Sequence, residues 1–343
     1  AHRSASVPLP WPLRQNLPFD DLAIHDATWW ADFPRSARQV MAMYAESGWP
    51  PIDGVIAVEP ALVADLLELT GPVTAAVDGE QRLITPENVQ DEIERQRRLE
   101  RAGADVTVSH KQVVAIIGEE VIDRLKVADQ ETLLEAARAI TEAADARDVQ
   151  IYVADAAVQE LIAERGWDGS LEPQAGVPTI AVTFANVAFG KSSERLRTSM
   201  SIALGPRTAA AQELKLDLQL TNTGRPDEDP FYGGLQRWWI QVALPEGATV
   251  TQSSSSPQPD PEAPNGGSYV VELAPEQSAT LSIEATMPAA DTILIRRQPG
   301  LYPVELRVAS SSCADMPLTT SMTEDVTVDL PGLCAGTTSA PRR

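Results

Sequence analysis

The amino-acid sequence predicts an α/β layered domain followed by an Ig-like antiparallel β-sandwich. In the first half, segments with helical periodicity alternate with short apolar strands, a pattern typical of α/β layers. After Gly169 the apolar residues recur every second position, as in half-buried antiparallel strands. We therefore place the α/β domain, with its Pro-rich N-terminal segment, at 1–172, the sandwich at 173–335 and a tail at 336–343.

The helices of the first half are predicted from their periodicity and end signals. Ala37, Val40 and Tyr44 recur at helical spacing from about position 36. Pro60 opens a second helix that stops at Thr70-Gly71-Pro72. Other helices are expected from Thr85, which would be the N-cap, and at about 109–126, 130–146 and from Asp155 to just before Gly166. Strands are expected at 53–58 and 149–153, with further strand candidates at 73–77 and 82–84.

Alternation of apolar and polar residues predicts the strands of the second half. In ELKLDLQLTNT (213–223) the four leucines share one face. In LQRWWIQVALPEG the residues on one face are Trp238, Ile240, Val242 and Leu244. The other candidate strands are 179–188, 196–204, 268–273, 278–286, 292–297, 303–309 and 324–330, a spacing that suggests a sandwich. The stretch SSSSPQPDPEAPNGG (253–267) is predicted to be a mobile loop, too polar and Pro-rich to pack.

Composition restricts the possible partners. The net charge of −22 is spread along the chain, so the protein repels nucleic acid and anionic membrane surfaces. No apolar run reaches the roughly 18–20 residues that a membrane helix needs. We therefore expect neither nucleic acid as a partner nor a membrane span within this sequence.

The two cysteines, Cys313 and Cys334, are too few for a four-ligand zinc site. Both are expected at loops or strand ends, and we predict that they form a disulfide. Closing about 20 intervening residues would stabilise the fold by roughly 3 kcal/mol and indicates an oxidising, extracellular setting. Two buried free thiols are the alternative.

The segment HDATWWADFP (25–34) has two interpretations. As a site, Asp26 and Asp32 would be metal or acid/base carboxylates, with His25 and Arg35 nearby. As structure, Asp32 caps the following helix, a proline occupies the first turn, and the two tryptophans cover the helix entry. We favour the structural interpretation, which explains Asp32 fully and Asp26 only in part.

Arginines cluster in the helix expected after Thr85, at Arg95, Arg97, Arg98 and Arg101. Clustered guanidinium groups can hold a pyrophosphate by bidentate contacts. Interleaved glutamates, Glu92, Glu94 and Glu100, instead favour i,i+4 ion pairs on a solvated face. No Gly-x-Ser-x-Gly motif or Gly-rich phosphate loop is present, and His110 and Lys111 are expected to open a helix and face solvent.

A series of motifs resembles, in order, the bacterial domain-of-unknown-function family 4012. The motifs are HDATWWADFPRSA, DGVIAVEP, LLELTGPV, ITPENV, VQIYVADAAVQELIAERGWDGSL, NVAFGKSS, LQLTNT, ALPEGA and RRQPGLYP. They span about 20 to 310, with His25 where the family usually has Arg and Glu59 where it usually has Asp. The family's α/β half is similar to the LytR–CpsA–Psr phosphotransferases, which move glycopolymers from a polyprenyl-pyrophosphate carrier using arginines, an Asp and Mg²⁺. That second similarity is an analogy of fold.

The resemblance also implies missing parts. The family normally begins with a membrane helix and an Asn-x-x-Glu-x-Arg segment leading into Gly-Gly-Phe, whereas this sequence opens at AHRSASVPLPWPL, which we interpret as a mature or cleaved start. Only two or three convincing strands are available for the helices of the first half to pack on, which gives too little apolar surface. We therefore expect the chain to be a piece of a larger precursor or a subunit of an assembly, with its α/β sheet completed from outside residues 1–343.

We interpret the sequence as a non-catalytic extracellular protein of the cell envelope or a surface assembly, tethered through a segment outside this chain. It would act through protein or glycan contacts, its partners being other chains, its own upstream segment or cell-wall glycan, and no cofactor is expected. The alternative is a glycopolymer phosphotransferase acting on polyprenyl-pyrophosphate-linked substrates with Mg²⁺. Its catalytic candidates are Asp26, Asp32, Arg35 and Arg38, and its ligand-binding candidates are Arg95, Arg97, Arg98 and Arg101. Such an enzyme would gather these arginines around one cavity.

Overall fold

The computed structural model describes residues 6–17, 20–171, 176–313 and 316–335, so the predicted tail at 336–343 lies outside it. The chain forms two compact units. The sandwich unit contains residues 1–55, 152–159 and 168–343, and the helical unit contains residues 56–151 and 160–167. This division differs from the predicted boundary at 172/173, because the N-terminal residues pack with the sandwich. The predicted layout of an α/β part and a β-rich part is confirmed.

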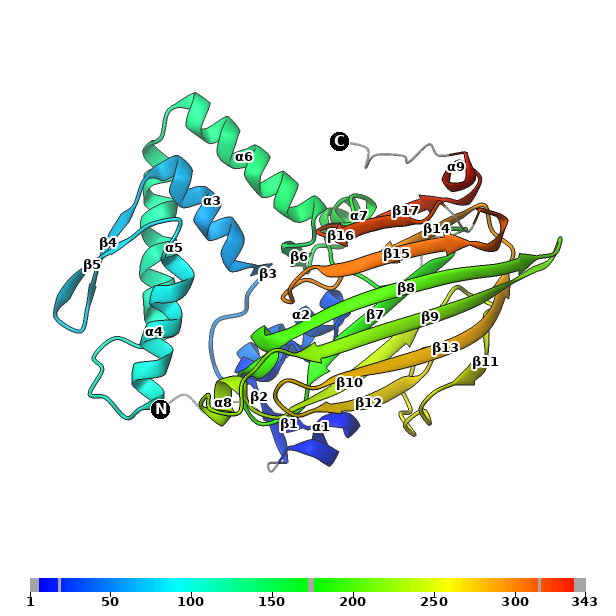
Figure 1. The fold of residues 1–343 in the computed structure, drawn as a ribbon. Coiled ribbons are helices and arrows are strands. Elements are labelled where there is room, and N and C mark those ends of the chain that lie inside the picture. Colours follow the sequence, from blue (N-terminus) through cyan, green and yellow to red (C-terminus); the bar gives the residue numbers. More distant parts are fainter. Residues whose placement is uncertain (1–5, 18–19, 172–175, 314–315, 336–343) are drawn as a thin grey trace. The chain divides into compact units, whose positions relative to one another are not determined.

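Two sheets form the sandwich (Figure 1). The six-stranded sheet has the order β11 (Thr249–Ser253), β13 (Ser278–Pro288), β9 (Ala211–Asn222), β8 (Leu196–Arg207), β15 (Val304–Ser310) and β16 (Leu318–Met322). The five-stranded sheet has the order β12 (Ser268–Leu273), β10 (Gln236–Ala243), β7 (Thr179–Asn186), β14 (Thr292–Arg296) and β17 (Val326–Asp329). The short elements η2 (Ser192–Arg195) and α8 (Pro230–Gly233) lie in the connections between strands.

The sheets are mixed, which corrects the prediction of a purely antiparallel sandwich. β14 runs parallel to β7, and β15 runs parallel to β8. The chain changes sheet between β13 and β14 and again between β14 and β15. The paired strands β14 and β7, and likewise β15 and β8, are therefore not joined by hairpins. A tight turn would force two strands to run antiparallel, whereas a longer connection allows them to run parallel. β11 and β16 were not among the predicted strands.

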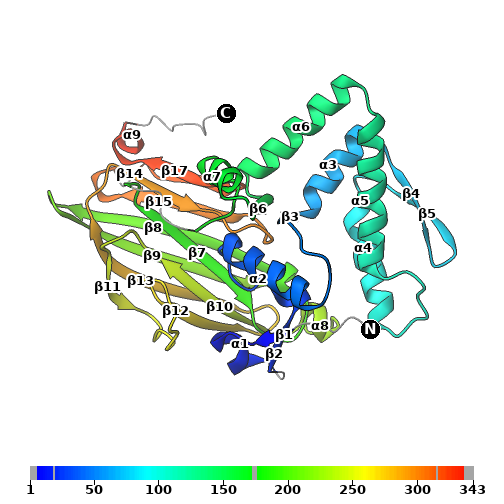
Figure 2. The same ribbon diagram turned by 180° about the vertical axis from the view of Figure 1, so that it is seen from behind.

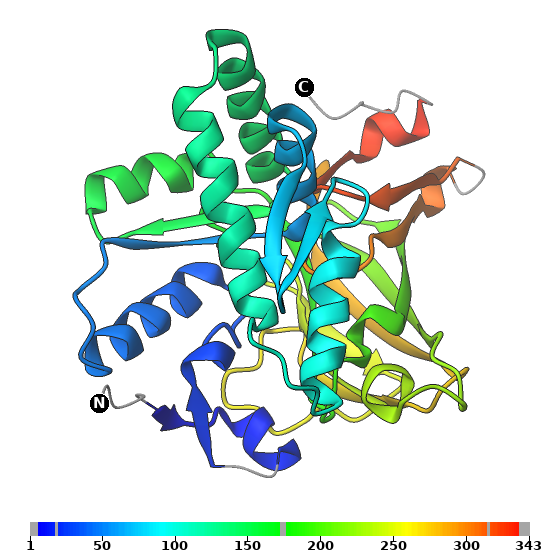
Figure 3. The same ribbon diagram turned by 90° about the vertical axis from the view of Figure 1, so that its left-hand side faces the viewer.

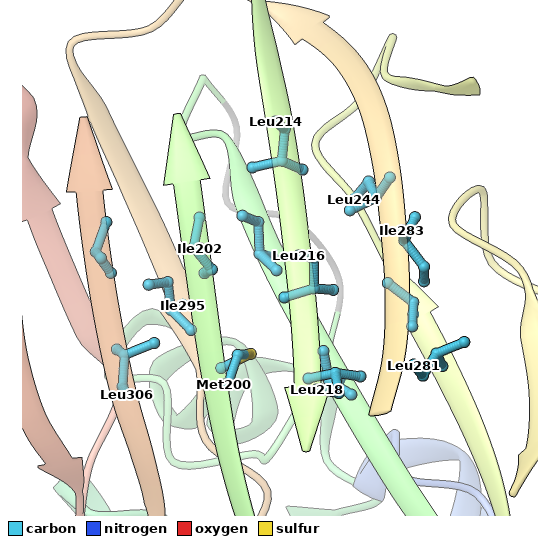
Figure 4. Close-up of a cluster of buried hydrophobic side chains, with 14 of the residues drawn as sticks. Met200, Ile202, Leu214, Leu216, Leu218, Leu244, Leu281, Ile283, Ile295 and Leu306 are labelled. Carbon is cyan, nitrogen blue, oxygen red and sulfur yellow. The ribbon is translucent and has the colours of Figure 1, made fainter. Parts of the chain in front are cut away.

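The core lies between the two sheets (Figure 4). Leu214, Leu216 and Leu218 of β9 point into it, as their alternation predicted, and meet side chains of β10 such as Ile240 and Val242. Each of these five side chains is at most 2% exposed. Burial of apolar surface contributes about 25 cal/mol per Å², so this cluster stabilises the sandwich unit.

The five-stranded sheet is buried on its outer face as well. Trp239 of β10 points away from the core yet is only 2% exposed. It packs in a second cluster with Val187 and with Leu9, Leu13, Leu22, Ala27 and Met43 of the N-terminal segment. That segment forms β1 (Ser6–Pro8), α1 (Trp11–Asn16), β2 (Asp21–Ala23), η1 (Ile24–Asp26) and α2 (Phe33–Glu46). Figure 2 shows α1 and α2 on this outer face, so the N-terminal segment is a third layer of the sandwich unit.

A disulfide joins the two sheets near their last strands. Cys313 ends η3 (Ser311–Cys313), directly after β15 of the six-stranded sheet. Cys334 ends α9 (Leu330–Cys334), directly after β17 of the five-stranded sheet. The predicted bridge between the two cysteines is confirmed.

The helical unit is built around a β-hairpin of β4 (Val73–Val77) and β5 (Glu80–Ile84). The hairpin packs against α3 (Pro60–Thr70), α4 (Val89–Arg101) and α5 (His110–Val127), as Figure 3 shows. Asp78 and Gly79 form its two-residue turn with φ of 52° and 81°, the conformation that Asp-Gly turns favour. The Asp78 carboxylate accepts hydrogen bonds from Gln96 and from the backbone of Thr107 and Val108, and the Gln96 contact contributes most to lowering its pKa.

One predicted helix, α4, starts later in the structure than the sequence predicted. α4 begins at Val89 with Asn88 at the N-cap position, three residues after the predicted cap Thr85. The backbone N–H of Thr85 donates to the Asn88 side chain, so the residues between them form a turn that precedes the helix. α6 (Gln130–Asp145) and α7 (Ala156–Glu164) lie where periodicity placed them.

β3 (Gly54–Val58) pairs with β6 (Val149–Val153) in a sheet of two strands, and the boundary between the units passes through both strands. The candidate strands at 73–77 and 82–84 do not join it, because they pair with each other in the hairpin. Ile56 and Val58 are 63% and 49% exposed. Completion of this sheet by a segment outside the chain stays a prediction.

Candidate functional site

Two adjoining hollows in the sandwich unit form the candidate site. Their volumes are about 290 and 270 Å³, and they share Pro12, Trp30, Asp260 and Glu262. The first is also lined by Trp29, Asp32, Arg35, Leu171, Thr183 and Gln241, and the second by Pro8, Pro10, Trp11, Gln39 and Pro261. We call the two hollows together the Trp30 cleft. Their combined size is in the range of ligand-binding clefts, roughly 300–1,000 Å³.

Asp32 positions one wall of the Trp30 cleft. It is the N-cap of α2, and its Oδ2 atom accepts a hydrogen bond from the Arg35 N–H at 3.2 Å. Its Oδ1 atom accepts from the Leu171 N–H at 3.1 Å. The predicted cap is confirmed, and the second contact ties α2 to the chain that enters the sandwich strands. Both carboxylate oxygens therefore bind backbone donors.

Trp30, Arg35 and Glu262 form a connected group at the centre of the cleft. The Arg35 guanidinium lies over the Trp30 ring, 4.3 Å from its centroid, where the negative face of the indole attracts a cation. Arg35 Nη2 donates to Glu262 Oε1 at 2.8 Å, and Trp30 Nε1 donates to Glu262 Oε2 at 3.4 Å. The hydrogen bond from Arg35 is the main cause that lowers the pKa of Glu262.

Asp260 orders the Pro-rich loop that carries Glu262. Its Oδ2 atom accepts from Ser268 Oγ at 2.7 Å and from Gln241 Nε2 at 3.2 Å, and its Oδ1 atom accepts from the Glu262 N–H at 2.9 Å. The predicted loop does connect two strands, but the prediction that it does not pack is wrong at this end. The hydrogen bonds of Asp260 hold this end of the loop in place although its composition is polar.

The other candidates of the HDATWWADFP segment lie elsewhere. Asp26 lies in η1, is exposed and does not line the cleft, and His25 belongs to the same turn. Arg38 is exposed on α2, with its guanidinium 5.6 Å from the centroid of the Tyr152 ring. Asp32 and Arg35 are thus brought together with the tryptophans, whereas Asp26 and Arg38 are not. In the part of the chain that the structure describes, no three His, Cys, Asp or Glu side chains form a group that could hold a metal ion.

The arginines of α4 belong to the helical unit. Arg95 Nε lies 3.1 Å from Glu92 Oε2, and Arg97 pairs with Glu94. The interpretation of a face covered by ion pairs is confirmed for these two pairs, although their spacing is i,i+3 instead of the predicted i,i+4. Arg98 and Arg101 lie in the last turn of the same helix.

Glu100 was expected to pair with an arginine of the same helix, but it is bound to His110. Its Oε2 atom lies 2.8 Å from Nδ1 of His110, and its Oε1 atom accepts from the His110 backbone. His110 is therefore partly buried at the start of α5, which corrects its predicted solvent-facing position. Lys111 is exposed as expected.

Nothing in the sequence pattern singled out Glu262 or Asp260 as neighbours of Trp30. Both lie more than half the chain away from it and in a segment whose composition suggested disorder. The one available signal was local, because Asp-Pro-Glu is a turn-forming sequence in which an aspartate can accept from the backbone two residues on. Such a turn predicts order in the loop, but it does not predict what the loop contacts.

Comparison with known proteins supports the family and leaves the function open. Residues 9–97 match the family described as "Protein of unknown function (DUF4012)", which confirms the resemblance to that family over this stretch. Comparison with curated proteins found no match. Among solved structures, a Legionella pneumophila protein described as a "putative nutrient binding protein" matches 38% of this chain with 10% identity and a TM-score of 0.23. The match spans about half of that protein, 54% of its chain.

Proposed function

We propose that this chain is a non-catalytic extracellular protein of the cell envelope that binds a partner in the Trp30 cleft. The observation that supports this proposal is that the carboxylates of the cleft are hydrogen-bonded to other groups of the same chain. Asp32 and Asp260 use both of their oxygens on donors from their own chain, and Glu262 is bonded to Arg35. These carboxylates hold the walls of the cleft in place.

The aromatic lining supports binding. Trp29, Trp30 and Trp11 give the cleft large, rigid apolar surfaces with polar edges, which bind ligands at small cost in side-chain entropy. The partners that we propose are another protein chain or cell-wall glycan. The Cys313–Cys334 disulfide supports a location outside the reducing cytoplasm. None of the described helices is both long enough and apolar enough to cross a membrane.

The charge of the cleft argues against a pyrophosphate ligand. Among the described residues that line it, the cation is Arg35, facing the carboxylates of Asp32, Asp260 and Glu262. The lining therefore has a surplus of negative charge, which repels an anion. For this reason we do not propose the phosphotransferase alternative.

The proposal is tested by screening the purified chain on arrays of peptides and of cell-wall oligosaccharides. The Trp30→Ala variant should lose the ligands that the wild type binds. The matched control is Trp49→Ala, which removes an exposed tryptophan that does not line the cleft. Identical binding by wild type and Trp30→Ala would show that the cleft is not the binding site. Turnover of a polyprenyl-pyrophosphate-linked glycan with Mg²⁺ would show that the protein is an enzyme.

A further inference from the structure

The second hollow of the Trp30 cleft has an unusual lining of rigid rings. Pro8, Pro10, Trp11, Pro12, Trp30 and Pro261 all face it. Proline and tryptophan rings present flat apolar surfaces that lose almost no conformational freedom when a ligand packs on them. Aromatic side chains, here Trp11 and Trp30, line the grooves that bind proline-rich segments in the polyproline II conformation.

From this lining we propose, building on the function proposed above, that the ligand of the Trp30 cleft is an extended, proline-rich peptide segment carrying Arg or Lys. A polyproline II segment has three residues per turn and makes no internal hydrogen bonds. Residues three apart share one face of such a segment, so prolines at that spacing can pack on the rings of Trp11 and Trp30 while the cationic side chain reaches the carboxylates. The segment is already extended before it binds, so little ordering entropy is lost.

The cleft already accommodates a guanidinium group. Arg35 lies on the face of Trp30 and donates to Glu262, which shows that this tryptophan–glutamate pair binds such a group with both stacking and charge. Trp30 and Glu262 line both hollows, whereas Arg35 lines the first one. A second cation that enters from the ring-lined hollow therefore meets Glu262 and Asp260 without displacing the chain's own arginine from Trp30.

Charge complementarity also favours a cationic partner over an anionic one. The cleft has more carboxylates than cations, and the whole chain has a net charge of −22. A field of this sign raises the local concentration of cationic ligands and speeds their association. A basic segment is thus attracted at a distance and then recognised by the rings.

A glycan fits the cleft less well, because a sugar needs several convergent polar groups that are still available for its hydroxyls. Gln241 donates to Asp260, and Asp32 and Asp260 already accept hydrogen bonds from their own chain. A neutral hydroxyl therefore gains little from these groups, whereas the charge of the carboxylates still attracts a cation. In the second hollow the polar side chains are Gln39, Asp260 and Glu262. The lining therefore favours a ligand with proline rings and a cationic side chain over a glycan with many hydroxyl groups.

The test is a set of titrations of the purified chain, followed by isothermal calorimetry. The probes are a synthetic peptide repeating Pro-Pro-Arg-Pro, the same peptide with Glu for Arg, chitotetraose and inorganic pyrophosphate. We expect binding of the Arg peptide alone. Trp30→Ala should weaken it by about tenfold or more, as for aromatic hot spots, and Trp30→Phe by less. Thermal unfolding of each variant checks that it is folded.

A charge-reversal variant tests the cationic contact. Glu262→Arg should lose the Arg peptide and gain measurable affinity for the Glu peptide. Glu305→Arg, which makes the same change at an exposed position of β15, should leave both affinities unchanged. Equal binding of the two peptides by the wild type, or unchanged binding by Glu262→Arg, would overturn the proposed ligand.

The two proposals fail in different ways. Binding of chitotetraose that depends on Trp30, with no binding of the Arg peptide, would overturn the peptide ligand and leave the binding function in place. Binding of pyrophosphate at the cleft would overturn both. No binding of the Arg peptide by the folded wild type would overturn the ligand proposed here, and the array screen would then decide the function.

Discussion

Arg35 and Glu262 lie 227 positions apart in the sequence, and their side chains are joined by an Nη2–Oε1 contact of 2.8 Å. The contact connects the first turns of α2 to the Pro-rich loop between β11 and β12, and so closes one wall of the Trp30 cleft. Both side chains are about half exposed, at 41% and 51%. An ion pair in that setting contributes no more than about 1 kcal/mol to stability, so its main effect is to position the loop.

The first prediction concerns the pH dependence of this pair. Arg35 lowers the pKa of Glu262 in the folded state. The stabilisation is therefore present above the usual pKa range of a glutamate and is lost as the pH falls through the lowered pKa. Glu262→Gln should reduce the free energy of unfolding by less than about 1 kcal/mol at neutral pH. Urea unfolding over an acidic pH series should show this difference shrinking towards zero, and a difference that stays constant would contradict the prediction.

The second prediction separates the two contacts of Asp32. Asp32→Ala should reduce the free energy of unfolding by about 1–2 kcal/mol, because it removes the cap and leaves the Leu171 N–H without its acceptor. Asp32→Ser restores an acceptor for the Arg35 N–H only, so it should recover about half of the loss. Full recovery by serine would show that the Leu171 contact contributes nothing. Loss of ligand binding with unchanged stability would show that Asp32 acts in recognition.

The third prediction concerns the bridge between the sheets. Unfolded but unreduced protein should react with no equivalent of a thiol reagent at Cys313 or Cys334. The double variant Cys313→Ser/Cys334→Ser should be less stable by about 3 kcal/mol, because the unfolded chain gains the entropy of the opened loop. Chemical unfolding of both proteins measures the loss. Two reactive thiols in the unreduced protein would contradict the disulfide.

The fourth prediction tests whether the N-terminal segment is a layer of the sandwich unit. Leu22 is fully buried against the outer face of the five-stranded sheet, so Leu22→Ala should cost about 2–5 kcal/mol. Leu235→Ala, at a half-exposed position of the same unit, should change stability by less than about 0.5 kcal/mol. Equal stabilities of the two variants would show that residues 6–17 and 20–23 do not cover the sheet.

Local patterns predicted most elements of the fold. The alternation in 213–223 placed the leucines of β9 in the core, and Pro60 and Thr70-Gly71-Pro72 marked the ends of α3 correctly. The adjacent tryptophans of β10 were harder, because alternation assigns only Trp238 to the core. Trp239 is buried by a separate part of the chain, and alternation within one strand carries no information about a second covering layer.

By itself, the sequence determined the Asp32 cap of α2, the strand faces, the disulfide pair and the resemblance to a family of unknown function. Each of these depends on residues close together in the chain or on a pair without competitors. Only the tertiary structure decided that Trp30, Arg35 and Glu262 meet, that the N-terminal segment joins the sandwich, and that both sheets are mixed. These features depend on contacts between residues far apart in the sequence. Such contacts form because large surfaces of the chain are buried against each other. The pattern of a single sequence does not show which of its surfaces will pack together.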